Sequence, residues 1–171
     1  MKKTTIGAGA GAAMVAVVIS YITPTIRSEE GTKYRPYRDI GSVMTVCSGT
    51  TGPDVVVGKV YSEADCEKLT EEDVAKAAQG VLKVSPQLIN HPMQLASAIS
   101  FSYNVGVGTY ERSSVARDFN AGNYQKGCDD LLKYTYAGGK YSIGLANRRR
   151  KEWTICMSTV NNNGGTHVGN P

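Results

Sequence analysis

Three side chains near the start of the chain have the types and the spacing that hydrolysis of a sugar bond requires. Glu30 is followed by Asp39 and then by Thr45 within one short stretch. A protonated carboxyl can donate to the leaving oxygen of a glycosidic bond, while a carboxylate and a hydroxyl hold the attacking water. The acid needs partial burial to keep its proton near neutral pH. The spacing alone fits a solvated surface pair equally well.

The sequence around these residues predicts a helix end followed by a β-hairpin. Gly41-Ser42 predicts a turn, and Val43–Cys47 alternates as a short strand does. A second β-type run, Val55–Val60, is expected to pair with it in a small antiparallel sheet. The acid would then end the preceding helix and face the hairpin across a groove.

The rest of the chain is mainly helical by its apolar periodicity. Ser62 can cap a long helix that begins at Glu63 and ends before Pro86. Shorter helices are expected over residues 93–105, 115–120, 125–136 and 143–156. The predicted class is therefore α+β, with a small antiparallel sheet in an N-terminal lobe, a mainly helical C-terminal lobe and a long helix joining them.

The composition indicates a globular protein with a basic C-terminal half. The 171 residues fit one domain or two small lobes, and 41% hydrophobic and 20% charged residues exclude a disordered chain. The net charge of +4 comes largely from the second half, including the run Arg148–Lys151. Such a face suits an anionic polymer such as peptidoglycan, or is simply solvated. No nucleic-acid-binding motif accompanies the charge, so nucleic acid is not an expected partner.

Four cysteines, an even number, suggest either disulfides or buried free thiols. They lack the close paired spacing of zinc ligands, and neither histidine is near one, so no metal site and no cofactor are expected. Four cysteines allow three pairings, and the sequence does not choose between them. The candidates are Cys47, Cys66, Cys128 and Cys156.

The N-terminus carries a candidate membrane segment. Lys2-Lys3 precede an uncharged segment, Thr4–Ile26, whose length is near that of a short transmembrane helix. Its many Gly and Ala residues leave an insertion free energy of only a few kcal/mol, about −0.3 to −0.6 kcal/mol for each Val or Ile. A cleaved signal peptide, a permanent anchor and a segment that inserts and later leaves the membrane are the three alternatives. The basic start places the N-terminus in the cytoplasm.

Three blocks of sequence together resemble the phage-type lysozymes, glycoside hydrolase family 24. The blocks are EGTKYRPYRDIGSVMT over residues 30–45, SFSYNVGVG over residues 100–108, and YAGGK with the later GL and RRR over residues 136–150. The resemblance implies a muramidase that cuts the β-1,4 bond between N-acetylmuramic acid and N-acetylglucosamine with inversion. Glu30 would be the general acid, with Asp39 and Thr45 holding the water. A lytic transglycosylase and a non-catalytic wall-binding protein are the alternatives.

The resemblance also assigns residues outside the catalytic stretch. It implies that Tyr103, Asn104 and Ser114 bind the sugar chain, although core packing is an equal alternative for Tyr103. It implies the disulfides Cys47–Cys66 and Cys128–Cys156. At the position of a histidine in many family members this chain has Thr50, so an ion pair of that histidine cannot form.

The N-terminal segment resembles that of signal-arrest-release endolysins from phages of Gram-negative bacteria. This implies a membrane segment over residues 1–26, a catalytic domain over 27–157 and a flexible tail over 158–171. The chain would be held silent in the host inner membrane, leave it for the periplasm, and there hydrolyse peptidoglycan as a monomer and lyse the host. Glu30 follows the segment so closely that membrane insertion would hold it at the bilayer surface.

Overall fold

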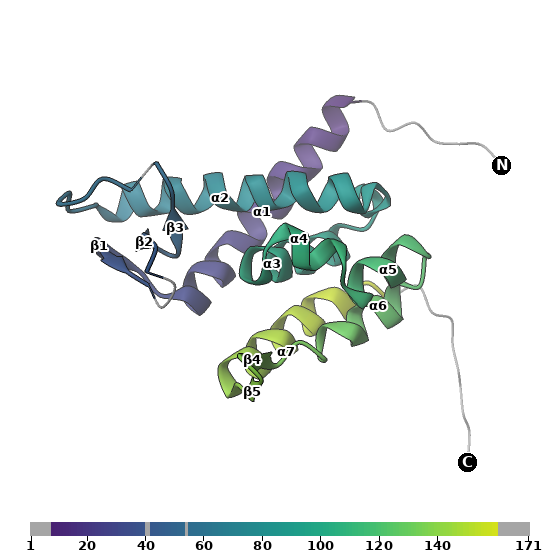
Figure 1. Ribbon diagram of the computed structural model, residues 1–171. Helices are drawn as coiled ribbons and strands as arrows, with labels where there is room; N and C mark the ends of the chain where they lie inside the picture. The colour runs from purple at the N-terminus through teal and green to yellow at the C-terminus, as the bar shows by residue number, and fades with distance from the viewer. Residues whose placement is uncertain (1–7, 40–41, 54, 161–171) are drawn as a thin grey trace, which may run out of the picture. The chain divides into compact units, whose positions relative to one another are not determined.

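The computed structural model describes residues 8–39, 42–53 and 55–160. The chain divides into two compact units, residues 1–80 and 81–171, which are described in turn. Figure 1 labels the helices and strands along the chain.

The first unit begins with one long helix, α1 (Ala8–Glu30), drawn in purple in Figure 1. Val18, Ile22 and Ile26 are four residues apart, so they lie on one face of the helix, and all three are almost fully buried. The stretch Gly11–Glu30 is also long and apolar enough to cross a membrane by length and composition. Residues 8–26 of the predicted membrane segment and the residue predicted as the acid therefore belong to one continuous helix, while residues 1–7 lie outside the described residues.

A three-stranded antiparallel sheet follows α1. Its strands are β1 (Lys33–Arg38), β2 (Met44–Cys47) and β3 (Thr50–Thr51), in the order β1-β2-β3. Pro36 lies within β1, which is possible because β1 is an edge strand and does not need that N–H for a ladder hydrogen bond. The proline also explains why the sequence does not indicate a strand here.

The prediction of a strand over Val55–Val60 is wrong. This segment consists of turns, in which the Val55 N–H donates to the Gly52 carbonyl and the Lys59 N–H to the Val56 carbonyl. The Val56 N–H donates to the Tyr61 hydroxyl at 2.8 Å rather than to a neighbouring strand. β3 takes the place beside β2 that the prediction gave to this run.

The long helix α2 (Glu63–Val84) has the predicted position and cap. The Ser62 hydroxyl accepts from the Asp65 N–H at 3.1 Å, and the Asp65 carboxylate accepts from the Ser62 N–H at 2.9 Å. This reciprocal arrangement satisfies the first amides of the helix. The bonds from the Ser62 N–H and hydroxyl lower the pKa of Asp65 below its usual value.

A disulfide fastens the sheet to α2. Cys47 at the end of β2 is bonded to Cys66 in the first turns of α2, and both pack in a buried cluster with Val46 and Tyr61. The pairing implied by the family resemblance is confirmed. Thr50 in β3 adds a second attachment, because its hydroxyl donates to the carboxylate of Asp73 at 2.8 Å.

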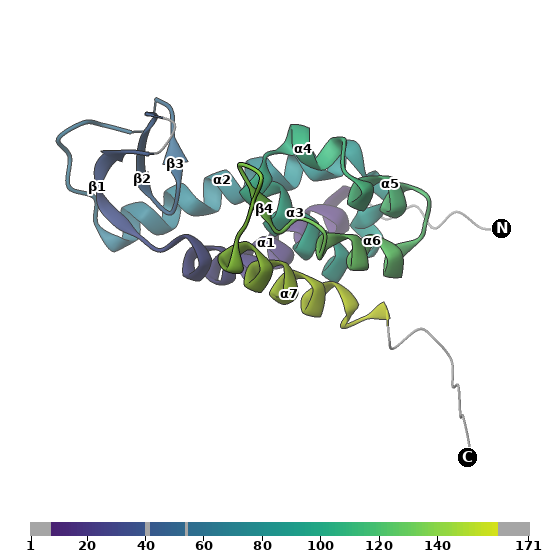
Figure 2. The ribbon, with the colours of Figure 1, turned by 60° about the horizontal axis from the view of Figure 1, so that its bottom comes forward.

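The second unit is mainly helical. Its elements are η1 (Pro86–Asn90), α3 (Pro92–Val105), α4 (Val107–Glu111), α5 (Ser114–Asn120), α6 (Tyr124–Leu131), β4 (Tyr136–Ala137), β5 (Lys140–Tyr141) and α7 (Ile143–Met157). Within this unit α3 packs on α7 and α5 packs on α6 (Figure 2). A Cβ on Gly127 would lie 2.4 Å from the ring of Phe119, so only glycine permits the close approach of α5 and α6.

One prediction for the second unit needs correction. The helix predicted over residues 125–136 ends at Leu131, and a β4–β5 hairpin follows, turning at Gly138 and Gly139 with positive φ. Thr159, in the predicted tail, accepts a hydrogen bond from Gln94 at 3.2 Å. The rest of that tail, residues 161–171, lies outside the described residues. The second disulfide, Cys128–Cys156, joins α6 to α7 and confirms the other implied pairing.

We expect each disulfide to stabilise the fold by about 3 kcal/mol, because closing loops of 19 and 28 residues restricts the unfolded chain. Replacing Cys47 and Cys66 together by Ser, and separately Cys128 and Cys156, should lower the free energy of unfolding by that amount in denaturant titrations of the oxidised protein. A loss below 1 kcal/mol in both double variants would contradict the expectation.

Candidate active site

Glu30 is the last residue of α1. The helix stops there because Gly31, with φ +69°, turns the chain, and its N–H donates to the Arg27 carbonyl at 3.0 Å. An αL glycine is a common way to end a helix, and its conformation strongly favours a residue without Cβ. Glu30 is exposed, which differs from the partial burial expected of it, because a helix end followed by a sharp turn leaves its side chain little cover within its own element.

Asp39 closes the hairpin between β1 and β2. Its N–H donates to the Val43 carbonyl at 3.0 Å, and its Oδ1 accepts from the Val43 N–H at 2.9 Å. The Ser42 N–H donates to the Asp39 carbonyl, and Ser42 itself has φ +61°. The carboxylate is thereby fixed by main-chain contacts of its own hairpin.

Thr45 lies on β2 and is buried, with 3% of its surface exposed. Its hydroxyl donates to the Val43 carbonyl at 3.1 Å, so its proton is engaged and its oxygen keeps the capacity to accept a hydrogen bond. The strand register places Thr45 opposite Tyr37.

The hairpin carries two of the three predicted residues. Tyr37 and Thr45 are cross-strand partners, and partners point to the same side of a sheet. Asp39 follows Arg38, the last residue of β1, and is joined to Val43, two residues before Thr45, by the two hydrogen bonds given above. Glu30 precedes that hairpin at the end of α1.

The predicted sugar-binding residues belong to the second unit. Tyr103 and Asn104 lie in the last turn of α3, and Asn104 accepts a hydrogen bond from Arg149 at 3.0 Å. Ser114 is the first residue of α5, and its N–H donates to the Tyr134 hydroxyl at 3.1 Å. The helix cap is its neighbour Ser113, whose hydroxyl accepts from the Ala116 N–H.

Two of the four residues in the basic run Arg148–Lys151 do not lie on the exposed surface predicted for it. Arg148 and Arg149 are buried in α7 and surround the buried carboxylate of Glu152, with Arg149 Nε 2.8 Å and Arg148 Nε 3.3 Å from it. The Ser100 hydroxyl donates to the same carboxylate at 2.7 Å. Burial raises the pKa of Glu152, while the two arginines act in the opposite direction. Half of this run is therefore a core network that cannot bind a polymer.

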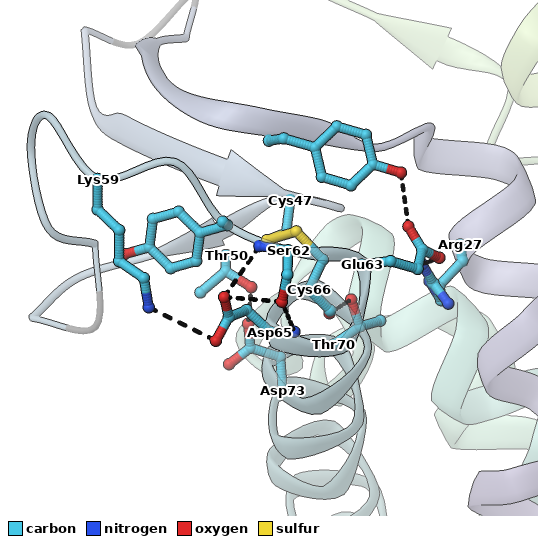
Figure 3. Close-up of a disulfide and its surroundings, with 12 residues drawn as sticks. Arg27, Cys47, Thr50, Lys59, Ser62, Glu63, Asp65, Cys66, Thr70 and Asp73 are labelled. Atoms are coloured by element: carbon cyan, nitrogen blue, oxygen red, sulfur yellow. Dashed lines mark hydrogen bonds and ion pairs between the residues drawn. A yellow bond between two sulfur atoms is a disulfide. The ribbon is translucent and has the colours of Figure 1, made fainter.

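Sequence reasoning missed a cluster that holds the end of α1. Arg27 donates to Glu63 Oε1 (Figure 3). Its other terminal nitrogen lies 3.9 Å from Glu67 Oε1. The Tyr34 hydroxyl of β1 donates to Glu63 Oε2 at 2.5 Å. The bond from Tyr34 and then that from Arg27 lower the pKa of Glu63. The sequence gives no sign of it, because Glu63 looks like an ordinary first-turn acid of a capped helix.

An open pocket of about 800 Å³ lies in the second unit, away from these residues in the sequence. His91 stacks on Tyr124 beside it, with ring centroids 3.9 Å apart, and Gln94 and Asp129 also line it. Burial lowers the pKa of His91. None of the residues predicted for catalysis or sugar binding lines this pocket.

Comparison with known proteins agrees with the fold. The phage lysozyme family model matches residues 27–152. The chain is 40% identical over 130 residues to an SAR-endolysin of bacteriophage PS119, covering 75% of this chain and 76% of that protein. It is 37% identical over 158 residues to an SAR-endolysin of Enterobacteria phage PA-2, covering 89% and 93%.

A solved structure gives the same result. The endolysin of Escherichia coli O157:H7 phage FAHEc1 superposes with a TM-score of 0.67 at 26% identity, covering 80% of this chain and 90% of that one. The helices and small antiparallel sheet thus form a lysozyme-like fold, and the chain belongs to the phage lysozyme family.

We expect the buried network on α7 to be a stability element. Glu152→Gln removes the charge that compensates two buried guanidinium groups and should lower the free energy of unfolding by about 3–5 kcal/mol. Arg150→Ala, on an exposed side of the same helix, should change it by less than about 0.5 kcal/mol. Denaturant titrations compare the two variants, and equal effects would contradict a structural role for Glu152.

Proposed function

We propose that this chain is an endolysin that hydrolyses peptidoglycan at the β-1,4 bond between N-acetylmuramic acid and N-acetylglucosamine, and so lyses the host cell. One observation carries the proposal. In a chain of the phage lysozyme family, a glutamate ends a helix, and the hairpin that follows carries an aspartate after its first strand and a threonine on its second.

In the proposed mechanism Glu30 donates a proton to the glycosidic oxygen as the bond breaks. Asp39 stays ionised and, with the hydroxyl of Thr45, holds the water that attacks the anomeric carbon from the opposite side. The fixed rotamer of Asp39 and the engaged proton of Thr45 support this role, because both groups then present acceptors to a water. An inverting reaction needs about 6.5–9.5 Å between the two carboxyls to admit that water.

We further propose that the N-terminal segment holds the enzyme in the host inner membrane, with its N-terminus in the cytoplasm, before release as a monomer to the periplasm. Gly11–Glu30 has the length and hydropathy for insertion, yet the same helix has a face, Val18 to Ile26, that is buried in the folded chain. A helix suited to both environments supports two alternative locations for it. In the membrane, α1 could not supply Glu30 to the folded site.

The catalytic roles predict a graded series of losses. Glu30→Gln should reduce the rate of peptidoglycan hydrolysis by about 10²–10⁴-fold, the usual share of a general acid. Asp39→Asn should come close to this, and Thr45→Ala should lose less because a water can replace part of a hydroxyl. The rates are measured on purified peptidoglycan.

Glu29→Gln is the matched control, since it makes the same chemical change one residue away and should keep near wild-type activity.

Mass analysis of the products distinguishes hydrolysis from transglycosylation. Hydrolysis leaves reducing muramic ends, whereas a lytic transglycosylase leaves anhydro ends lighter by one water and would not need Asp39. Full activity of Glu30→Gln would contradict the proposal.

Release from the membrane should depend on the small residues of α1. A Cβ on Gly9 meets no atom within 4 Å, and Ala12 and Ala16 are exposed, so Leu at all three fits the folded helix. Each Leu favours the bilayer by about 0.5 kcal/mol. The triple Leu variant should stay with the membrane fraction and delay lysis, while the triple Ser variant should be released at least as readily as wild type. Unchanged partition and timing would contradict this role.

A further inference from the structure

We infer that Glu63 is a positioning residue for hydrolysis, the carboxylate onto which Arg27 docks to place Glu30 beside the hairpin. This rests on the proposed catalytic role of Glu30. Figure 3 shows Glu63 at the start of α2 with Arg27 of α1 against it. In this role Glu63 acts through the elements that it holds.

The two oxygens of Glu63 bind the two parts of the candidate site separately. Oε1 accepts from Arg27 of α1, the helix that ends at Glu30, and Oε2 accepts from Tyr34 of β1, the strand that leads to Asp39. The Tyr34 carbonyl also accepts from the Tyr61 N–H at 2.8 Å, just ahead of α2. One carboxylate is therefore bonded to both the acid-bearing helix and the water-holding hairpin.

Arg27 lies in the last turn of α1, the turn that carries Glu30. It is three residues before Glu30, and its carbonyl accepts the bond from Gly31 that ends the helix. Only 18% of its side chain is exposed, against 59% for Glu63, and its Nε is buried without a hydrogen-bond partner among the described residues. A guanidinium so desolvated depends on its carboxylate partners, so loss of Glu63 should free the turn that carries Glu30.

Glu63 is held rigidly enough to position another group. Cys66, three residues later, is bonded to Cys47 of β2, and the Ser62–Asp65 capping contacts fix the first turn of α2 (Figure 3). Lys59 reinforces that turn at 3.5 Å from Asp65. The backbone at Glu63 is thus held by contacts that do not involve α1.

Arg27 also has a second partner in the proposed membrane state. It is the first charged residue after the uncharged Thr4–Ile26 segment, so in the inserted chain it lies at the headgroups, where lipid phosphates bind arginine. On release Glu63 replaces those phosphates. Docking at Glu63 then follows membrane exit as a separate step, and it can fail without preventing exit.

The test uses the full chain purified from the soluble fraction. Glu63→Gln should lower kcat for peptidoglycan about tenfold and leave KM within about twofold, because the acid is misplaced while sugar binding is untouched. Glu67→Gln, a matched change at the weaker 3.9 Å contact, should stay near wild type. Thermal unfolding should barely move in either variant, because both carboxylates are exposed.

A double-variant cycle shows whether Glu63 acts through Arg27. Arg27→Gln should lose as much kcat as Glu63→Gln, and the double variant no more than either. Losses that multiply, or a Glu63→Gln kcat within twofold of wild type, would overturn the inference. If Glu63→Gln does not reach the soluble fraction, Glu63→Asp, which withdraws the carboxylate by one methylene, replaces it with the same expected loss. Glu30→Gln is run beside them, and its activity tests the proposed function independently.

Discussion

The arrangement of the candidate site depends on one carboxylate at the start of α2. Glu63 accepts from Arg27 on the helix that ends at Glu30 and from Tyr34 on the strand that leads to Asp39. These contacts are made largely at the surface, where an ion pair contributes little free energy and exchanges readily with water or other ions. An attachment of that kind suits a helix that docks only after membrane release and stays docked only while the Glu63 carboxylate is ionised.

The other attachments of the first unit are of a different kind. The Cys47–Cys66 bond, the buried cluster around Val46 and the Thr50–Asp73 hydrogen bond join the sheet to α2 through covalent and buried contacts. The neutral hydroxyl of Thr50 makes this link to α2, because the chain has no histidine at this position that could form an ion pair. The hairpin with its two water-holding candidates is thus joined to α2 by contacts that do not involve α1, whereas Arg27 of α1 is joined to α2 by a partly exposed ion pair with Glu63.

Much of this was predictable because local rules act on neighbouring residues. Ser62 and Asp65 form the reciprocal cap that their spacing predicts, and the apolar repeat of α2 gives its length. The edge strand was missed because Pro36 interrupts its pattern, and Val55–Val60 was wrongly taken as a strand because β-propensity ignores the turns that Gly52 and Gly58 impose. A long-range ion pair such as Arg27–Glu63 produces no periodic pattern in the sequence from which it could be predicted.

The same limit explains the basic run on α7, where Arg148 and Arg149 turn inward to Glu152 although four consecutive cations predict an exposed face. The sequence shows the four positive charges, but it does not show that two of the side chains point into the core.

The Cys47–Cys66 bond has a consequence for where the enzyme can mature. A thiol pair stays reduced in the bacterial cytoplasm and oxidises only after export. Before oxidation the sheet has no covalent bond to α2. The first turns of α2, which carry Glu63, then lack the attachment that Cys66 provides. On the proposed route to the periplasm, copies still inside the host therefore lack this bond, and the first unit gains the covalent attachment between its sheet and α2 only on the oxidising side of the inner membrane.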